Sequence, residues 1–424
     1  MKHSSVKGMN DILPGQTESW QRLETLARKS LESYGFREIR TPVLEDTDVF
    51  IRGVGETTDI VTKEMFTFAD RKERSLTLRP EGTAPVVRSY VEHNLSEKSA
   101  DTKLYYIGPM FRSERPQKGR SRQFHQIGTE VIGTDSPYAD VEVISQLDAM
   151  LKTFGLRQFV IKINSLGCPE DKQAYTEKLR DYLKDKSNLL CKDCKERVSK
   201  NVLRVLDCKN DACKAALRGA PDVLETHCQP CKDHFRVVTE CLSSLGVSFQ
   251  LAKHLVRGLD YYTRTVFEIT HSALGGQDAL AAGGRYDNLV RQFGGPAVGA
   301  VGYALGMERV LIALKDAASP DRKPVVAIAT HGDAAKFEGL KLAENIRKHL
   351  DAVVLTDVRG TSFKAQLRGF DKAGAGLVVI IGEDELKKGA YLIKDMSLKE
   401  QKEIDAGGIV EEVKKKLGSI KDSN

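Results

Sequence analysis

The chain has 424 residues, 41% hydrophobic and 29% charged, a composition typical of a globular protein with two or three domains. Its formal charge of +6, from 65 basic and 59 acidic residues, permits a polyanionic partner without requiring one. No apolar run approaches the roughly 20 residues of a membrane helix. The apolar segment of a signal peptide is missing from the first residues, MKHSSVKGMNDILPG, so we expect a cytoplasmic protein.

The first part of the chain alternates helical and strand-like patterns. Apolar residues recur at steps of three and four between residues 17 and 34, which predicts an amphipathic helix that ends at Gly35. FREIRTPVLED predicts a strand interrupted at Pro42, and RSLTLRPEGTAPVVRSYVEH predicts a strand, a turn and a helix. KLYYIGPMFRSE and RQFHQIGTEVIG flank the basic loop RPQKGRS, which predicts a long antiparallel hairpin.

The second part begins with a change of composition. From residue 169 to residue 235 the sequence is rich in Lys, Asp and Cys, which predicts an inserted helical module. Strand-like sequence returns at RGLDYYTRTVFEI, residues 257–269, and continues through LAAGGRYDNLV and the glycine-rich AVGAVGYALGMERVLIAL. After the linker KDAASPDRKP, the apolar runs VVAIAT, AVVLTD and LVVIIG alternate with helical segments, which predicts a separate α/β domain.

Two charged segments carry the candidate chemistry. The predicted hairpin holds five basic residues within a dozen positions: Arg112, Arg115, Lys118, Arg120 and Arg122. Guanidinium groups match phosphate oxygens, although a solvated basic loop has the same composition. In GYALGMERVL, a glycine-rich strand precedes Arg309 in a first helical turn, which permits a flat or anionic ligand to approach closely.

Taken in order, these segments resemble the motifs of a known family. GFREIRTPVLE, FRSERPQKGRSRQFHQ and GYALGMERVLIAL resemble motifs 1, 2 and 3 of class II aminoacyl-tRNA synthetases. RGLDYYTRTVFEI and AAGGRYDNLV resemble the two histidine-specific motifs of the histidyl-tRNA synthetase family. The C-terminal domain is similar to the family's anticodon-binding domain, so the resemblance covers nearly the whole chain.

The resemblance implies a fold and a domain plan. We expect an α+β catalytic domain with an antiparallel sheet, a helical insertion, and a C-terminal α/β domain with a mixed sheet. The expected catalytic domain spans residues 1–168 and 236–318, the insertion 169–235, and the anticodon-binding domain 325–424.

The resemblance also implies a reaction, in which histidine is activated with ATP to histidyl-adenylate and then transferred to the 3′ end of tRNA(His). The implied catalytic residues are Arg257 and Arg112, both at the α-phosphate, where a fixed guanidinium stabilises the charge of the transition state. We expect the ligand to supply the counter-charge of Arg257, and Mg²⁺ to accompany the β- and γ-phosphates. The other implied ATP-binding residues are Glu114 and Phe124 at the adenine, Arg309 at the nucleotide, and Arg120 or Arg122 at the distal phosphates.

A histidine pocket follows from the same resemblance. Glu81, Thr83 and Gln126 are implied for the α-ammonium group, Glu130 and Tyr262 for the imidazole, and Tyr261 and Tyr286 for the rest of the pocket. A buried acceptor that only a ring N–H satisfies rejects amino acids of similar size. If residues 257–269 form one strand, the two adjacent tyrosines point to opposite faces, which would leave one of them a packing residue.

Partners are implied as well. The loop RPQKGRSR is placed to meet the acceptor end of the tRNA, and the candidate contacts are Arg115, Gln117 and Lys118. Motif 1, around Pro42, is a dimer interface in the family, which implies a homodimer. No anticodon-reading residue can be chosen from the sequence.

Six of the eight cysteines are paired in the sequence. The pairs are Cys191 with Cys194, Cys208 with Cys213, and Cys228 with Cys231. Two such pairs could close a tetrahedral zinc site that cross-links the insertion, but the alternative, a set of reduced cysteines on helices, is favoured, so no metal ligand is assigned. Cys168 and Cys241 are predicted to be unpaired core residues.

Three other functions compete with this one. The regulatory subunit of ATP phosphoribosyltransferase, a catalytically inactive histidine sensor, resembles the same catalytic domain. Such paralogues usually lack the anticodon domain and lose the motif arginines, whereas Arg112, Arg257 and Arg309 are present here. A pure RNA-binding module would need neither RPEGTAP nor RGLDYYT, and a synthetase for proline or threonine is excluded only by the histidine-specific motifs.

Overall fold

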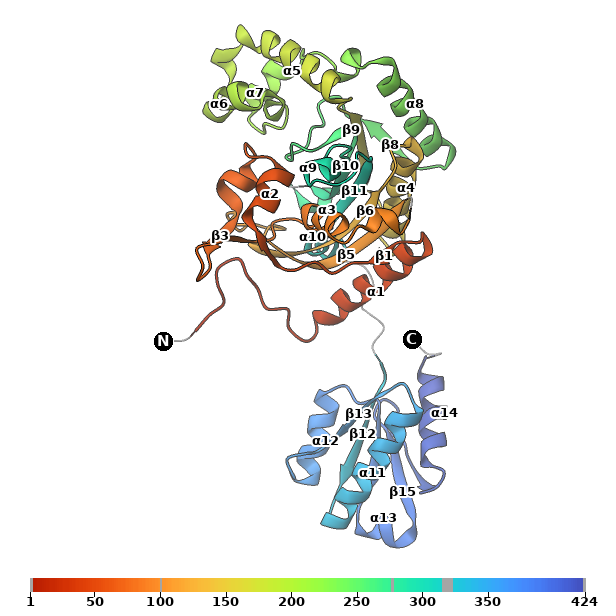
Figure 1. The fold of residues 1–424 in the computed structure, drawn as a ribbon. Coiled ribbons are helices and arrows are strands. Elements are labelled where there is room, and N and C mark those ends of the chain that lie inside the picture. The colour runs from red at the N-terminus through yellow and green to blue at the C-terminus, as the bar shows by residue number, and fades with distance from the viewer. Residues whose placement is uncertain (1–2, 100, 276–277, 315–322, 422–424) are drawn as a thin grey trace. The chain divides into compact units, whose positions relative to one another are not determined.

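A computed structural model describes residues 3–99, 101–275, 278–314 and 323–421, without the side chains of 419–421. The chain divides into two compact units, Met1–Ser319 and Pro320–Asn424, each with its own hydrophobic core (Figure 1). None of the helices in the described ranges has both the length and the apolarity needed to cross a membrane.

Within the described residues, the first unit is built on an eight-stranded sheet. The hairpin predicted from the sequence is confirmed, because β5 and β6 pair antiparallel along their whole length. The outer pairs β1–β5 and β7–β8 of the described sheet are parallel, and its other pairs are antiparallel. In spatial order the strands are β1 (Arg37–Glu38), β5 (Thr102–Phe111), β6 (Gln123–Ile132), β11 (Ala300–Gly306), β10 (Ala279–Arg285), β9 (Thr263–Thr270), β7 (Val160–Ser165) and β8 (Phe249–Leu251).

Helices cover one face of this sheet and leave the other for a cavity. On β6, Ile127 and Val131 lie in the core beneath the helices, so the alternating residues Gln126 and Glu130 face the opposite side. The first of these helices confirms the sequence prediction, and Gly35 follows its end with a φ of 80°. The covering helices are α1 (Thr17–Ser33), α4 (Pro137–Thr153), α8 (Gln229–Ser244) and α10 (Met307–Ala313).

Smaller elements border the sheet. Pro42 separates β1 from the next strand, as the sequence predicted. α3 begins at Thr83, within the RPEGTAP segment, and packs on the cavity side of β6. These elements are a three-stranded sheet of β2 (Leu44–Asp46), β4 (Ser75–Leu78) and β3 (Phe66–Ala69), and the helices α2 (Thr47–Val54), α3 (Thr83–Glu92) and α9 (Leu289–Gln292).

The strand predicted at residues 257–269 is shorter than expected. β9 begins at Thr263, and residues 256–262 form a loop in front of it. The expectation that Tyr261 and Tyr262 point to opposite faces is therefore wrong. Both rings are buried and their centroids lie 4.6 Å apart, because strict alternation requires extended backbone at both residues and the loop does not provide it.

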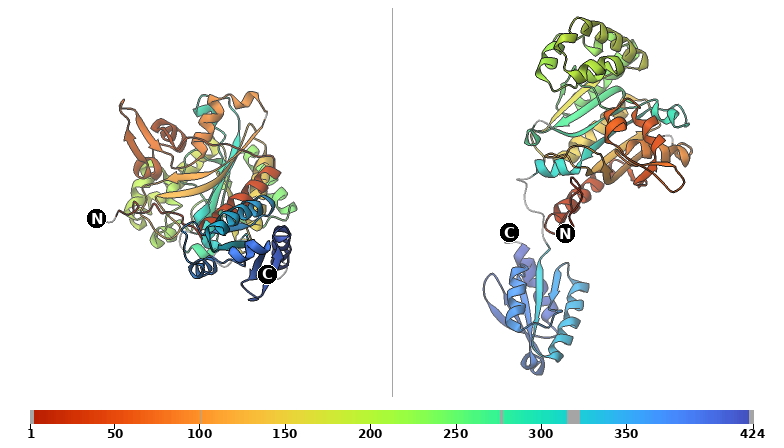
Figure 2. Two further views of the ribbon diagram at one scale, coloured as in Figure 1. Left: turned by 90° about the horizontal axis from the view of Figure 1, so that it is seen from below. Right: turned by 90° about the vertical axis from the view of Figure 1, so that its left-hand side faces the viewer.

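The inserted helices form a lobe at one end of the first unit, drawn in yellow and green in the right-hand view of Figure 2. They are α5 (Pro169–Lys184), α6 (Lys192–Lys200) and α7 (Asp211–Leu217). The expected boundary at residue 235 falls inside α8. That helix continues into the sheet's core, where Val238 and Leu242 are fully buried.

The second unit confirms the predicted α/β architecture with a mixed sheet. In its described part, β12 (Val325–Thr330) lies between β13 (Val353–Thr356) and β14 (Leu377–Ile381), parallel to both. Two antiparallel strands, β15 (Ala390–Asp395) and β16 (Gln401–Asp405), extend the sheet. Its helices are α11 (Asp333–His349), α12 (Phe363–Lys372), α13 (Glu383–Lys388) and α14 (Ile409–Lys421).

Candidate active site

A cavity of 840 Å³ opens on the face of the large sheet that is not covered by α1 and α4. This volume is within the range of small-molecule sites. Its lining comes from the β5–β6 hairpin, the turn before α3, the loop at 256–262, the start of α10 and the insertion. Segments far apart in the sequence therefore meet around one space.

The floor of the cavity depends on small residues in β11. Ala304 and Gly306 line the cavity, and Gly302 lies beside the buried carboxylate of Glu130. A Cβ atom at Gly302 would stand 1.9 Å from the Glu130 Oε2 atom, which no packing adjustment of a buried carboxylate can accommodate. The glycine-rich pattern of the sequence thus makes room for the floor's functional groups.

Arg112 and its neighbours form one wall. The Nε of Arg112 donates to the carbonyl oxygen of Pro80 at 2.9 Å, and its guanidinium carbon lies 5.2 Å from the centroid of the Phe124 ring. Glu114 forms an ion pair of 2.7 Å with Arg120. All four of the predicted residues Arg112, Glu114, Arg120 and Phe124 line the cavity.

Arg257 faces this wall from the loop before β9. Its Nη1 forms an ion pair of 2.6 Å with Glu268 of β9, and its buried Nε has no hydrogen-bond partner among the described residues. The expectation that only a ligand would supply its counter-charge is wrong, because Glu268 already does so. Asp207 of the insertion lies nearby, and burial raises the pKa of its carboxyl.

Arg309 joins two parts of the site. It lies in the first turn of α10, as predicted, and lines the cavity. Its Nε donates to the carbonyl of Gly119 in the hairpin loop at 2.9 Å, and its Nη1 donates to the carbonyl of Ala279 at 2.5 Å. Burial lowers the pKa of this guanidinium.

Four of the predicted histidine-binding residues, Glu81, Thr83, Glu130 and Tyr286, form a connected hydrogen-bond network. Glu81 accepts from the backbone N–H groups of Thr83 and Ala84, both at 2.8 Å, at the start of α3. The Thr83 hydroxyl donates to Glu130 at 2.7 Å, and the Tyr286 hydroxyl donates to the other oxygen of Glu130. Burial raises the pKa of Glu130 to about 8.

The network lies partly behind the cavity surface. Glu130 and Tyr286 are bonded to each other, and neither is among the described residues that line the cavity. Tyr261, Tyr262 and Gln126 do line it. The buried Oε1 of Gln126 has no hydrogen-bond partner within the described chain, so an acceptor is left for a ligand.

Other predicted residues lie away from the cavity. Arg122 is not among the described lining residues, and its Nε donates to the Glu114 carbonyl at 3.2 Å. Arg115, Gln117 and Lys118 are exposed on the loop between β5 and β6.

Several lining residues were not predicted from the sequence. Glu268 did have a sequence signal, because it is a charged residue on the same face of β9 as the buried Val266, two positions away. Glu64, Asp207 and the insertion's Arg197 and Arg204 line the cavity too, but they lie in irregular or helical segments without a sequence signal.

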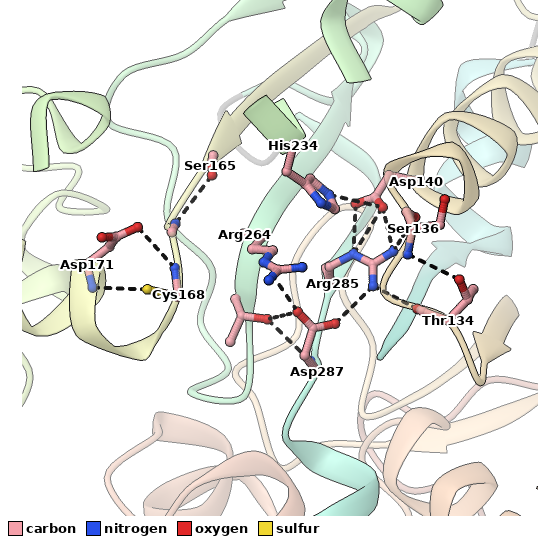
Figure 3. A network of polar contacts seen from close by, with 12 residues as sticks. Thr134, Ser136, Asp140, Ser165, Cys168, Asp171, His234, Arg264, Arg285 and Asp287 are labelled. Carbon is pink, nitrogen blue, oxygen red and sulfur yellow. Dashed lines mark hydrogen bonds and ion pairs between the residues drawn. The ribbon is translucent and has the colours of Figure 1, made fainter. Parts of the chain in front are cut away.

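A buried arginine anchors the segment that carries Tyr286. Arg285 is fully buried and forms ion pairs with Asp140 of α4 at 2.6 Å and with Asp287 at 2.9 Å, as Figure 3 shows. It also donates to the carbonyls of Thr134 and Ser136. Although burial raises the pKa of Asp140, the charge of Arg285 holds that pKa below its ordinary value.

The cysteines form two groups among the described residues, each with ligand atoms within 4.8 Å of one another. Cys168 belongs to one of them. Its prediction as a core residue is wrong, because it is half-buried and caps the start of α5, where its sulfur accepts from the backbone N–H of Asp171. Cys241 stays outside both groups and packs against the core. The groups are Cys191, Cys194, Cys208 and Cys213, and Cys168, Asp171, Cys228 and Cys231.

Comparisons with known proteins agree with these motifs. Residues 8–310 match the family described as histidyl-tRNA synthetase, and residues 325–416 match the anticodon binding domain family. A histidine–tRNA ligase of Thermodesulfovibrio yellowstonii is 46% identical over 417 residues, covering 98% of this chain and 99% of the relative. One of Geobacter sulfurreducens is 47% identical over 401 residues, covering 95% and 97%.

A solved structure agrees with the sequence relatives. The crystal structure of apo histidyl-tRNA synthetase from S. aureus superposes with a TM-score of 0.81 at 32% identity, covering 97% of this chain and 99% of that one. The family match, the relatives and the fold extend over both units. The chain belongs to the histidyl-tRNA synthetase family.

Proposed function

We propose that this chain is a histidine–tRNA ligase, which activates histidine with ATP and transfers the histidyl group to the 3′-hydroxyl of tRNA(His). The observation that carries the proposal is the convergence of Arg112, Arg257 and Arg309, from three distant segments, on one cavity beside the Glu81–Thr83–Glu130 network. Relatives named histidine–tRNA ligase, matched over nearly their whole length, support it.

In the first step the histidine carboxylate attacks the α-phosphorus of ATP, an oxygen–phosphorus bond forms, and pyrophosphate leaves. Arg112 and Arg257 both line the cavity and stabilise the negative charge that gathers on the α-phosphate oxygens. Donors fixed in this way are often worth about 3–4 kcal/mol each. The pairing of Arg257 with Glu268 supports this role, because it holds the guanidinium in place before ATP binds.

The rest of the nucleotide has matching groups. Glu114 and Phe124 hold the adenine, Arg309 contacts the nucleotide, and Arg120 is favoured over Arg122 for the distal phosphates because it lines the cavity. Mg²⁺ bound with ATP would neutralise charge on the β- and γ-phosphates, and the lining carboxylate of Glu64 would supply an oxygen ligand of the kind that this ion prefers.

Histidine is recognised by two sets of groups. Glu81, Thr83 and Gln126 accept from the α-ammonium, and the unpartnered Oε1 of Gln126 supports this assignment. Glu130 reads the imidazole together with Tyr262, while Tyr261 and Tyr286 complete the pocket. A buried polar group at this point favours a side chain that can hydrogen-bond to it over an apolar side chain of similar size, because the apolar one would leave the group without a partner.

The tRNA contacts both units. The exposed loop residues Arg115, Gln117 and Lys118 meet the acceptor end, and the unit from residue 325 onward reads the anticodon. The proposed catalytic domain is 1–168 with 236–318, the insertion is 169–235, and the anticodon-binding domain is 325–424. The intact arginines and the named relatives argue against the histidine-sensing paralogue.

We also propose a cytoplasmic homodimer formed through motif 1. Val43, Leu44 and Phe68 are 38%, 37% and 47% exposed around the three-stranded sheet, and a partner that covered them would bury apolar surface. Light scattering at micromolar concentration should give twice the chain mass of 47.0 kDa. A particle of one chain mass under those conditions would contradict the dimer.

The first experiment is histidine-dependent exchange of labelled pyrophosphate into ATP, with proline and threonine as controls. Exchange with histidine alone establishes adenylate formation and the identity of the amino acid. Histidine binding without any exchange would instead support the sensor paralogue and would remove the catalytic roles of Arg112 and Arg257.

A further inference from the structure

The insertion brings four cysteines together that take no part in the proposed reaction. Cys191 and Cys194 flank the start of α6, Cys208 follows the short helical turn at 202–205, and Cys213 lies in α7. Their four sulfur atoms lie within 4.8 Å of one another, and the sulfurs of Cys191 and Cys208 are 3.9 Å apart. Two sequence pairs, separated by more than a dozen residues, therefore form one compact group.

These distances fit a metal ion rather than a disulfide. A disulfide needs an S–S distance of about 2.05 Å, which the 3.9 Å separation exceeds by far. In a tetrahedron with Zn–S bonds of about 2.3 Å, neighbouring sulfurs are roughly 3.8 Å apart. Because all four sulfurs lie within 4.8 Å of one another, they enclose space for a single ion rather than a cluster of several metals.

The surroundings of the group suit a charged zinc–thiolate centre. Cys194 and Cys213 are fully buried, and the backbone N–H of Cys191 donates to the Cys213 sulfur at 3.1 Å. Such second-shell hydrogen bonds stabilise thiolate ligands. Four thiolates around Zn²⁺ leave two negative charges, and a lysine directly follows each cysteine: Lys192, Lys195, Lys209 and Lys214.

The insertion also needs a stabilising cross-link of this kind. The helices that carry the cysteines, α6 and α7, have nine and seven residues. Helices this short are marginal on their own, and small modules often depend on a metal for their stability. The segment between the two cysteine pairs must nevertheless be ordered, because it contacts the catalytic domain.

Those contacts reach the active site. Arg204 forms an ion pair of 2.5 Å with Asp59, and the Asn201 side chain donates at 2.8 Å to Asp260, three residues after Arg257. Cys191 and Cys208 themselves are among the residues that line the cavity. A metal that fixes this segment would therefore fix one rim of the cavity.

We propose that Cys191, Cys194, Cys208 and Cys213 bind one structural zinc ion that holds the insertion against the rim of the active site. The second group, around Cys168 and Asp171, is excluded from the proposal. Its Asp171 carboxylate already accepts from the backbone N–H groups of Cys228 and Cys168, at 2.9 and 3.4 Å, so these contacts describe a helix cap (Figure 3).

The test begins with the metal content of the full-length chain, purified without chelator and measured by mass spectrometry of the elements. Cys208→Ser and Cys213→Ser should each lose one equivalent of zinc relative to the wild type. Cys241→Ser, a cysteine outside both groups, should keep the wild-type amount. A wild-type chain without zinc, one that holds iron instead, or unchanged zinc in both cluster variants would overturn the proposal.

A second measurement does not depend on any substitution. Cys191 and Cys208 are only half-buried, so without a metal their thiols should react with iodoacetamide. With zinc bound, both should be protected, and removal of the metal by a strong chelator should raise their rate of alkylation at least tenfold, as read by peptide mass spectrometry. Equal rates before and after chelation would contradict the zinc site, since burial alone does not change with a chelator.

Discussion

At the scale of single residues, the site is held in position by charges that pair before any substrate arrives. Arg257 is bonded to Glu268 through one nitrogen and retains an unpartnered buried Nε within the described chain. An arginine held in this way has a fixed orientation but keeps a hydrogen-bond donor for a ligand. It can meet a phosphate oxygen without a costly reorganisation, which is the condition for electrostatic stabilisation of a transition state.

Replacement of Arg257 tests this role. Arg257→Ala should lower the rate of histidine-dependent pyrophosphate exchange roughly 100- to 1000-fold, the usual effect of losing one fixed donor. Arg257→Lys should recover little, because an ammonium cannot bond to Glu268 and to a phosphate in the same geometry. The exposed Arg236 of α8 is a matched control, and Arg236→Ala should keep the wild-type rate. A wild-type rate in Arg257→Ala would refute the assignment.

Glu130 gives a prediction about pH. Its pKa is raised by burial to about 8 from an ordinary value of 4.5, so the folded chain binds the proton more tightly than the unfolded chain. The stability that this proton contributes is complete below pH 4.5 and is lost as the pH rises toward 8. The loss is on the order of 5 kcal/mol at most.

Urea denaturation at a series of pH values measures this effect. In Glu130→Gln the free energy of unfolding should decline less steeply between pH 4.5 and 8 than in the wild type. Glu142→Gln, a carboxylate paired with Lys103 at the surface, should retain the wild-type slope. Identical slopes for Glu130→Gln and the wild type would show that the carboxyl at 130 does not titrate in this range.

At the scale of elements, strand alternation divides the large sheet into a packed face and a reactive face. On β6 and β11 the core residues Ile127, Val131, Val301 and Leu305 face α1 and α4, while the alternate positions include the polar Gln126 and Glu130 and the small Gly302, Ala304 and Gly306. Arg285 ends β10 and ties it to α4, and in this way it positions the next residue, Tyr286, against Glu130. This arginine sits in a histidine-specific motif, yet its contacts are structural.

Removal of Arg285 should therefore reduce stability. Arg285→Met leaves Asp140 buried without its main partner, and the free energy of unfolding in urea should fall by about 3–5 kcal/mol. The double variant with Asp140→Leu should recover part of the loss, because it removes the uncompensated charge as well. A single variant as stable as the wild type would mean that His234, 3.4 Å from Asp140, suffices as a partner.

At the scale of the whole molecule, we expect adenylate formation to depend on the first unit alone and tRNA charging to depend on both units. Met1–Ser319 contains the whole described cavity, and Pro320–Asn424 has a core of its own. A chain that ends at residue 322 should keep histidine-dependent pyrophosphate exchange. Its kcat/KM for charging tRNA should fall by roughly 100-fold, since one of two linked binding surfaces is lost. Undiminished charging would show that the second unit makes no contribution to tRNA binding.

Much of the site could be predicted from the sequence because its motifs are local. The hairpin, the RPEGTAP turn and the start of α10 each place their functional residues within one or two elements, so the pattern of residues alone predicts their faces. The prediction failed at residues 257–262, where aromatic and β-branched residues suggested a strand. The backbone there forms a loop that buries both tyrosines in the cavity wall.

The sequence by itself determined the family, the order of the domains and the antiparallel hairpin, and most of the ATP- and histidine-binding residues that it predicted line the cavity. Only the tertiary structure decided which cysteine pairs meet, that Glu268 pairs with Arg257, and that Glu130 is bonded to Tyr286. The physical reason is sequence separation. Local periodicity fixes the face on which a side chain lies, whereas contacts between distant segments depend on how whole elements pack, which no local pattern encodes.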